Sequence, residues 1–333
     1  MFLHENSKAV AVAEQSQVAE ARREARNLAA SIGLSESDRE RVSIVATEMA
    51  TNLVKHTPGG GALIAGVLPG RSGIQLMALD KGPGMDIERC IPDGFSTAGS
   101  AGTGLGAIRR LSSVFDAYSF NSGTVVLSHI YAKGEQPGKS GELDVGAVSV
   151  PMAGEEVCGD GWEVWQNENR CVAMVVDGLG HGVQAYDAAM EARRIFSLCA
   201  GKSGIEVLEN IHAALQKTRG GAAAVADIDI PGQTVSYTGA GNISALVVGN
   251  TMRSMVSMNG TVGVGTLRAK AFSYAWEAGG MLIMFSDGIS THWKIEDYPG
   301  LRNRHAATIA GVIYRDYGRG RDDATVLVVK SIN

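Results

Sequence analysis

The first part of the chain shows two kinds of apolar spacing. In some stretches an apolar residue recurs every three or four positions, which places these side chains on one face of a helix. In others apolar residues form short, dense runs, which is typical of strands. Gly33 is suited to end the first helix, and Ser37 with Glu40 predicts a capping box at the start of the second. The pattern predicts helices at 15–32, 37–56 and 105–113 and strands at 62–68, 74–79, 114–120 and 124–130.

The second part of the chain is richer in strand-like runs. Two helix-like stretches at 183–200 and 204–217 separate the third run from the fourth, and a further helix is expected at 301–314. Strands that cluster around paired helices predict stacked layers. The expected strands are 145–151, 162–166, 171–176, 222–230, 234–238, 244–248, 271–276, 281–285 and 325–329.

These patterns predict an α+β protein with two domains. A chain of 333 residues exceeds the size at which single cores stop growing, roughly 250–300 residues. The stretch GEQPGKSGE at 134–142 is polar and glycine-rich, as linkers are. We therefore expect a first domain at 1–133, a linker at 134–142 and a second domain at 143–333.

Composition narrows the classes of function. The net charge of −5 and the pI near 5.8 do not favour nucleic-acid binding, which usually needs a basic face. No apolar run approaches the roughly 18 residues of a membrane helix, and the acidic start MFLHEN does not predict a signal peptide. The 4 cysteines show no Cys-x-x-Cys spacing, which favours reduced thiols and a cytoplasmic protein.

Acidic residues recur at strand ends in the second part. Asp160 lies in CGDGW, Asp177 in VVDGLGHG, Asp287 in FSDGIS, and Asp322 and Asp323 in RDDAT. One Asp-Gly pair at a strand end is usually only a turn. Several carboxylates that share one cleft require a cation, and Mg²⁺ or Mn²⁺ with oxygen ligands would suit them. Two such ions can hold a water for attack on a phosphate, so the motifs predict a binuclear metal phosphohydrolase.

In this order, the four motifs resemble those of the PPM-type metal-dependent serine/threonine phosphatases, and most closely the SpoIIE and RsbX-like branch. The resemblance covers about residues 143–331 and implies an αββα sandwich with two Mn²⁺ or Mg²⁺ ions. It implies that Asp177 bridges both ions and that the Gly178 carbonyl, Asp160 and Asp287 complete their shells. In the last motif Asp322 is the preferred ligand and Asp323 the second choice.

Two positions depart from the phosphatase pattern. Cys158 stands where glycine is common, and Asn242 stands where relatives often carry histidine; neither change removes an expected ligand. His181 has two interpretations. It either protonates the leaving serine oxygen as a general acid or only hydrogen-bonds nearby backbone or water.

Three stretches of the first part suggest a nucleotide site. In IVATEMATNLVKH, Glu48, Asn52 and His56 lie four apart on one helical face, although such a polar row alone is normally solvated surface. Asp80 follows a strand in LMALDKGPGM. Glycines before a helix let its N–H groups bind phosphate. The glycines of LMALDKGPGM and SAGTGLGAIRRL are Gly82, Gly84, Gly102, Gly104 and Gly106.

Together these stretches resemble the GHKL (Bergerat) ATPase fold, and within it the RsbT-like anti-sigma-factor serine kinases, over about residues 10–132. The resemblance implies that Asn52 holds Mg²⁺ on ATP, that Glu48 is the general base, and that Asp80 accepts from the adenine amino group. The glycines would shape the phosphate pocket, and Thr124 would contact adenine through water. The loop 86–101 is polar and rich in small residues, and we expect it to close over ATP as a lid. His56 is either a further site residue or an ordinary helix histidine.

A kinase-like half and a phosphatase-like half predict opposing control of one phosphorylated serine or threonine. The resemblance implies a STAS-domain antagonist as the target, in partner-switching control of a sigma factor or a stress response. The alternative is that the first half only senses ATP or docks a partner and regulates the phosphatase. A histidine kinase fragment ranks last, because no histidine-bearing helix pair precedes the nucleotide motifs.

Overall fold

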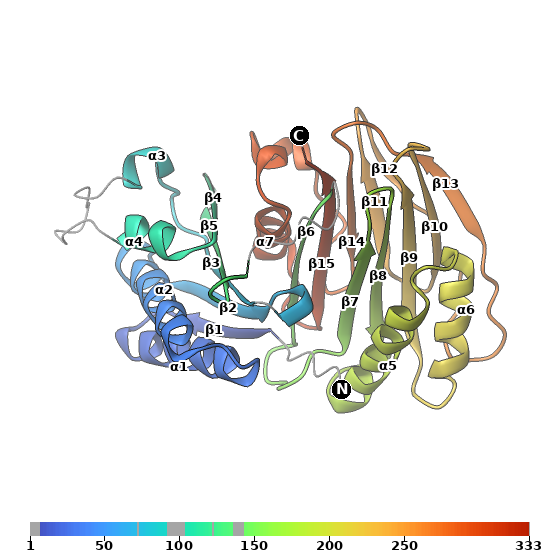
Figure 1. Cartoon of the computed structure of the whole chain (residues 1–333), viewed down its shortest axis with the longest axis horizontal. Coiled ribbons are helices and arrows are strands. Elements are labelled where there is room, and N and C mark those ends of the chain that lie inside the picture. Colours follow the sequence, from blue (N-terminus) through green and yellow to red (C-terminus); the bar gives the residue numbers. More distant parts are fainter. Residues whose placement is uncertain (1–6, 72, 92–103, 122, 136–142, 333) are drawn as a thin grey trace. The chain divides into compact units, whose positions relative to one another are not determined.

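The computed structural model describes residues 7–71, 73–91, 104–121, 123–135 and 143–332 (Figure 1). The chain forms two compact units. Unit 1 contains residues 3–138 together with Lys294–Asp316, and unit 2 contains Lys139–Trp293 and Tyr317–Asn333. The predicted mixed α/β class with two domains is confirmed. None of the helices among the described residues is both long and apolar enough to cross a bilayer.

Unit 1 is built on one antiparallel sheet with the order β1-β2-β3-β5-β4. Its helices α1, α2 and α4 pack on one face, where their apolar side chains join alternate strand residues in one core. The elements are β1 (Lys8–Val12), α1 (Gln15–Ser31), α2 (Glu36–His56), β2 (Gly61–Val67), β3 (Gly73–Asp80), α3 (Ile87–Cys90), α4 (Gly104–Leu111), β4 (Val114–Phe120) and β5 (Gly123–Tyr131).

The end of α1 and the start of α2 follow local chemistry. Gly33, with φ of +83°, follows the last turn of α1, as the sequence predicted. The N-cap of α2 is Ser35, whose hydroxyl accepts a hydrogen bond from the N–H of Asp38 at 3.2 Å. The expected cap at Ser37 is therefore wrong, because Ser37 already lies in the first turn.

The opposite face of the unit 1 sheet is covered by a segment from much later in the chain. This segment, Lys294–Asp316, includes most of α7 (Ala306–Tyr317), whose residues 306–313 are all buried. A Cβ on Gly311 would collide with Met77 of β3. The backbone N–H of His305 donates to Asp116 Oδ2 of β4 at 2.8 Å. Sequence order had assigned this segment to the second domain, whereas the structure places it in unit 1.

Unit 2 contains two stacked antiparallel sheets, of order β13-β10-β9-β8-β7 and β12-β11-β14-β15-β6. One apolar core joins both sheets, and a second lies under α5 and α6, which cover the outer face of the first sheet. The elements are β6 (Leu143–Val150), β7 (Asp160–Gln166), β8 (Arg170–Gly178), α5 (Val183–Cys199), α6 (Gly204–Leu215), β9 (Gly221–Asp229), β10 (Thr234–Ala240), β11 (Ser244–Val248), β12 (Met252–Ser254), β13 (Ala271–Ala275), β14 (Met281–Phe285) and β15 (Ala324–Ser331).

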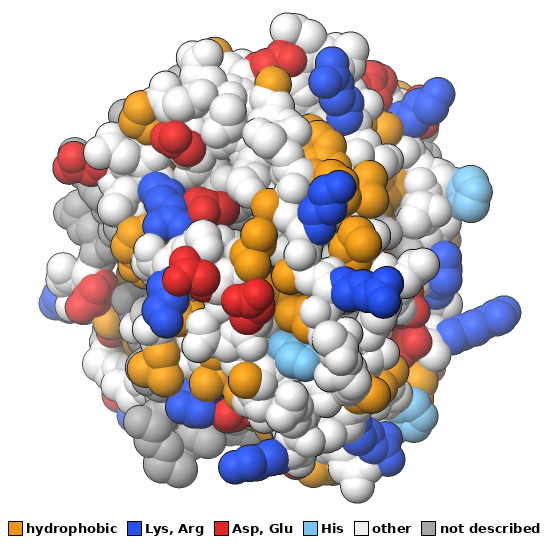
Figure 2. Space-filling model, turned by 90° about the vertical axis from the view of Figure 1, so that its right-hand side faces the viewer, with side chains coloured by type: hydrophobic (Ala, Val, Ile, Leu, Met, Phe, Trp, Pro, Cys, Tyr) orange, Lys and Arg blue, Asp and Glu red, His pale blue; other side chains and the backbone are white. Residues whose placement is uncertain are grey.

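The surface carries charges of both signs. Figure 2 shows acidic, basic and hydrophobic side chains intermixed on one face of the molecule. Over the described part of that face, the basic side chains do not merge into a continuous patch.

Candidate nucleotide pocket and metal centre

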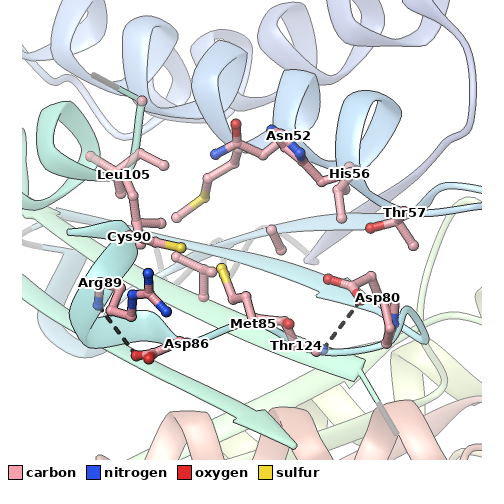
Figure 3. A pocket seen from close by; sticks show the side chains of 18 residues that line it. Asn52, His56, Thr57, Asp80, Met85, Asp86, Arg89, Cys90, Leu105 and Thr124 are labelled. Atoms are coloured by element: carbon pink, nitrogen blue, oxygen red, sulfur yellow. Dashed lines mark hydrogen bonds between the residues drawn. The ribbon is translucent and has the colours of Figure 1, made fainter. Parts of the chain in front are cut away.

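Unit 1 contains a pocket of about 410 Å³ between its helical layer and its sheet (Figure 3). Apolar side chains from α2, α4 and the sheet form much of its wall, and a smaller number of polar groups face it. The polar lining residues are Asn52, His56, Thr57, Asp80, Asp86, Arg89 and Thr124. A mostly apolar cavity with a few oriented polar groups is the usual form of a small-molecule site.

Asp80 is the most firmly held polar group of this pocket. Its Oδ1 accepts hydrogen bonds from the backbone N–H groups of Gly82 at 2.8 Å and Thr124 at 3.3 Å. Among the described residues, Oδ2 receives no donor. Burial raises the pKa of Asp80, and the two backbone hydrogen bonds oppose that shift. The carboxylate is thus fixed in orientation, with one oxygen available to a ligand.

The polar face of α2 meets the start of α4. A Cβ on Gly104 would lie 3.0 Å from Glu48 Oε2 and 3.4 Å from Asn52 Oδ1. Glycine at this position therefore lets the N-terminus of α4 approach both side chains. His56 also lines the pocket, one turn beyond Asn52.

The predicted glycines differ in how strictly the surrounding structure requires glycine at their positions. Gly84 has φ of +81°, and a Cβ there would lie 2.8 Å from the Phe120 carbonyl oxygen, so a side chain is excluded. Gly106 is buried within α4. Gly102, with most of the expected lid, lies outside the described residues. The Thr124 hydroxyl is hydrogen-bonded to Ser119 Oγ at 2.9 Å, and the backbone N–H of Thr124 donates to Asp80 Oδ1 at 3.3 Å.

Sequence reasoning missed part of the pocket wall. Met85, Asp86, Arg89 and Cys90 come from the segment after β3 and face the cavity. Met85 ends the stretch LMALDKGPGM, and Asp86, Arg89 and Cys90 lie in the segment 86–101 that was expected to form a lid. The sequence assigned none of them a place in the pocket wall.

In unit 2, the predicted aspartates gather at the ends of strands from both sheets. Asp160 and Asp177 are direct partners in the β7–β8 ladder. Burial raises the pKa of Asp177 to about 9, and the charges of Asp160, Asp287, Asp322 and Asp323 add to this shift. The structure therefore brings the other four carboxylates within electrostatic reach of Asp177.

Asp160 is a second buried carboxylate that is affected by its acidic neighbours. Burial raises its pKa to about 7, and the charges of Asp323 and Asp287 contribute. Its Oδ2 accepts a hydrogen bond from Ser286 Oγ at 2.6 Å. Its Oδ1 is buried without a hydrogen-bond partner among the described residues. A buried carboxylate oxygen in that state is costly unless a cation or water satisfies it.

The remaining aspartates have different partners. Both oxygens of Asp323 accept backbone hydrogen bonds, from Met152 at 2.7 Å and from Gly159 at 2.8 Å. Asp322 is less buried, and its Oδ1 accepts from the N–H of Asp323 at 2.9 Å. Asp287 Oδ2 accepts from Asn242 Nδ2 at 2.7 Å, so the asparagine at this departure from the family pattern holds an expected ligand.

The donor set fits hydrated divalent cations. Clustered carboxylates with raised pKa values and an unsatisfied oxygen on Asp160 suit a hard cation. Within the described ranges, no three His, Cys, Asp or Glu side chains already form a group that could hold a metal ion.

The loop after β8 approaches α5 closely. A Cβ on Gly178 would collide with the backbone of Ala185, so glycine is required at this position by packing, whatever its carbonyl binds. Farther along the same loop, His181 Nδ1 lies 2.6 Å from Glu155 Oε1. Glu155 was not recognised in the sequence, since it lies outside the four motifs.

Comparisons with known proteins agree with this division. Residues 11–128 match the family model "Histidine kinase-like ATPase domain", and residues 167–331 match "Stage II sporulation protein E (SpoIIE)". The serine/threonine-protein kinase RsbT of Bacillus subtilis (strain 168) is 34% identical over 115 residues, which are 34% of this chain and 84% of RsbT.

Two further comparisons concern the second half. The phosphoserine phosphatase RsbX of Bacillus subtilis (strain 168) is 21% identical over 139 residues, covering 41% of this chain and 70% of RsbX. A structure of RsbX in complex with magnesium covers 59% of this chain and 98% of its own, at 17% identity and a TM-score of 0.51. A structure described as part of the bacterial stressosome covers 56% of this chain and 98% of its own, at 25% identity and a TM-score of 0.53.

Proposed function

Because the chain belongs to the histidine kinase-like ATPase family through its first half and to the SpoIIE phosphatase family through its second, we propose that it is a bifunctional switch protein. The first half phosphorylates a serine or threonine of a partner protein with ATP, and the second half removes that phosphate. The observation that carries the proposal is the presence, in one chain, of a formed nucleotide pocket and a cluster of five carboxylates.

The phosphatase site is assigned to the aspartate cluster. Two bound Mg²⁺ or Mn²⁺ ions would supply a nucleophilic water and neutralise the phosphate. Asp177, on which the other four carboxylates act, would be a principal ligand of these ions, and the Gly178 carbonyl would be another. Asp160 offers its unsatisfied Oδ1, and Asn242 orients Asp287.

The last motif contributes one ligand and one structural aspartate. Asp323 uses both oxygens to hold the backbone of Met152 and Gly159. Among the described residues, only one oxygen of Asp322 accepts a backbone hydrogen bond. Burial is the main cause of the raised pKa of Asp287, and the charge of Asp322 adds to it. This difference supports Asp322 as the metal ligand and gives Asp323 the task of holding the chain before β7.

The kinase site is assigned to the pocket of unit 1. Asp80 would accept a hydrogen bond from the adenine amino group, because its carboxylate is fixed and has a free oxygen. Asn52 would hold Mg²⁺ on the phosphates, and Glu48 would accept the proton of the attacking hydroxyl. Their convergence on Gly104 supports placing the phosphates at the start of α4.

The proposed target is a small STAS-domain antagonist of a stress or sigma-factor pathway. The support comes from the kind of relatives that the chain resembles, namely the kinase RsbT, the phosphoserine phosphatase RsbX and a stressosome structure. A phosphate adds a charge of roughly −1.5 to −2, which is sufficient to break or form an interface.

The test is intact-mass analysis of a candidate STAS partner. The partner is incubated with the full chain, ATP and Mg²⁺, and then with Mn²⁺ after ATP is removed. We expect a gain and then a loss of one phosphoryl group. Glu48→Ala should stop the gain and leave ATP binding and the loss intact. If the wild type removes phosphate but never adds it, the first half is an ATP-sensing or docking module instead.

A further inference from the structure

Two exposed arginines of unit 2 lie at the edge where the aspartates gather, and each precedes a strand of a different sheet. Arg219 comes just before β9, whose first residues pair with Asp177 and Gly178 of β8. Arg319 comes before β15 and lies three residues ahead of Asp322. Neither arginine stands in one of the four aspartate motifs, and the sites described above use neither of them.

Arg219 lies over the loop that follows Asp177. The backbone N–H of Leu179 donates to the carbonyl of Gly220 at 3.0 Å, which extends the pairing of β8 with β9 into this loop. Gly180 has φ of +82°, and a Cβ there would lie 3.3 Å from Nη1 of Arg219. Glycine at this position therefore leaves room for the guanidinium group beside the backbone that leads away from Asp177.

Arg319 is tied to the other sheet through its backbone. Its N–H donates to the carbonyl of Gly288 at 2.8 Å, and the N–H of Ser290 donates to the carbonyl of Tyr317 at 2.9 Å. These two bonds hold Arg319 beside the loop that follows Asp287. Burial is the main cause of the raised pKa of Asp287, and the charge of Arg319 opposes it, so the guanidinium group lies within electrostatic reach of the cluster.

Both arginines are without an anionic partner. Neither guanidinium group has a hydrogen bond or an ion pair among the described residues, whereas Arg170 of the same unit donates to both oxygens of Asp227. Asp287 cannot serve Arg319 fully, since it is an expected metal ligand and already accepts from Asn242. A positive charge beside a cation site is unfavourable unless an anion lies close to both. The two arginines therefore favour a bound anion at this edge.

We propose that Arg219 and Arg319 bind the phosphate group of the phosphorylated serine or threonine, with one arginine supplied by each sheet. The inference rests on the proposed phosphatase function and adds to it the residues that hold the substrate. A planar guanidinium group can donate two parallel hydrogen bonds to phosphate oxygens. A phosphate monoester carries a charge of roughly −1.5 to −2 at neutral pH, which two arginines match.

The first experiment measures phosphate binding without turnover. The full chain in Mg²⁺ is titrated with inorganic phosphate by calorimetry. We expect Arg219→Gln and Arg319→Gln each to weaken binding about 10-fold, because each removes a hydrogen bond to a charged group. Lysine in place of either arginine should recover only part of the loss, since it keeps the charge but not the two parallel donors.

The matched control is Arg253→Gln. Arg253 is also exposed, but it lies on β12 opposite Val247, near the end of β11 that is remote from Asp287. This variant loses the same charge from the same unit, and it should bind phosphate as the wild type does.

Steady-state kinetics provide a second measurement. The substrates are a phosphoseryl peptide and p-nitrophenyl phosphate, both with Mn²⁺. A contact to phosphate that is present in the substrate and in the transition state affects mainly KM. We therefore expect Arg219→Gln to raise KM about 10-fold for both substrates and to change kcat less than about threefold. A structural defect would instead lower kcat.

Arg319→Gln should also have an effect of opposite sign. Removal of a positive charge beside Asp287 should strengthen Mn²⁺ binding, by about threefold in a calorimetric titration, while phosphate binding weakens. Local unfolding would weaken both, so the two titrations together separate a direct phosphate contact from damage to the site.

Three results would overturn the inference. These are a wild type that does not bind phosphate, unchanged phosphate affinity in both arginine variants, and an equal loss in Arg253→Gln, which would indicate a general effect of surface charge. A wild type that binds phosphate through both arginines but hydrolyses neither substrate would remove the proposed phosphatase function and leave the phosphate site in place.

Discussion

The pocket of unit 1 and the aspartate cluster of unit 2 hold their carboxylates in different environments. The pocket is a cavity of about 410 Å³ with largely apolar walls, and Asp80 within it is held by two backbone donors. In the cluster, hydrogen bonds to Asp160, Asp287 and Asp323 coexist with repulsion between carboxylates, which adds to the raised pKa values of Asp160 and Asp177. No acidic neighbour among the described residues contributes to the raised pKa of Asp80, whereas the cluster holds carboxylates whose repulsion a cation would relieve.

The two sites also differ in how they are assembled. The pocket draws on one sheet and the helices on one of its faces, so a single core orders it. The cluster draws on strands of two stacked sheets, and Ser286 links them by donating to Asp160. Changes in the cluster should therefore have larger effects than changes in the pocket.

The largest effect is expected for Asp177→Asn. This change removes the carboxylate that interacts with all the others, so phosphatase turnover should fall by more than the roughly 10- to 100-fold typical of supporting residues around a metal. Turnover of p-nitrophenyl phosphate with Mn²⁺ measures this. ATP affinity, measured by calorimetry, should not change, and a parallel loss there would contradict the separation of the two sites.

Asp80→Asn should have the next largest effect, on ATP affinity. The amide oxygen can still accept from Gly82 and Thr124, but the charged acceptor for the adenine amino group is lost. A hydrogen bond to a charged group contributes about 1.5–3 kcal/mol, so ATP should bind roughly 10- to 100-fold more weakly.

Calorimetric titration of ATP checks this prediction. Asp86→Asn is the matched control, because Asp86 lines the same pocket but is exposed and caps α3. Equal losses in both variants would mean that general charge, and not the fixed carboxylate, governs binding.

Removal of divalent cations should make the stability of unit 2 depend on pH. The pKa values of Asp160 and Asp177 rise from 3.8 to about 7 and about 9. The folded state therefore retains protons that the unfolded state has released, and the free energy of unfolding falls as pH rises through this window. Saturating Mg²⁺, at about 100 times its Kd, should restore about 2.7 kcal/mol.

Thermal unfolding at pH 5 to pH 9, with EDTA or with Mg²⁺, provides the measurement. The transition should move to lower temperature with increasing pH in EDTA, and less so in Asp177→Asn. A metal-free transition that instead rises with pH would show that the carboxylates do not repel one another in the fold.

The smallest effect is expected for Gly311→Val, which touches neither site. The added side chain would press α7 against Met77 on the back of the unit 1 sheet. Overpacking of this kind costs about 1–3 kcal/mol, which denaturant unfolding can measure. Met77→Ala in the same chain should recover part of the loss, and a strictly additive double variant would argue against this contact.

Much of the fold follows from the sequence because its signals are local. The strands around Asp177 and Asp287 are continuous apolar runs, and the structure has strands there. The first strand, β1, was missed because it is only five residues long and buries only Val10 and Val12 at the sheet edge. The start of α7 was expected five residues too early, because residues 301–303 form a separate 3₁₀ turn before it.

The site residues also fall into those that a local sequence signal identifies and those that it does not. Residues such as Asp80 and Asp160 stand in short motifs, and the structure places them in a pocket and a cluster. Glu155 stands in no motif, and only the folded chain brings it to His181. Met85 ends the Asp80 stretch, but nothing in its local sequence shows that it faces the pocket. Packing between residues far apart in the chain cannot be read from local spacing, and the place of Lys294–Asp316 is the clearest example.

Lys294–Asp316 comes late in the chain but belongs to unit 1. A cut between the two family matches would therefore remove part of unit 1. A chain that ended at residue 138 would keep every nucleotide motif but lose the segment that packs on Met77 and Val125. The exposed hydrophobic face of the sheet would then promote aggregation. Recombination that exchanged only the later half would carry away part of the earlier one.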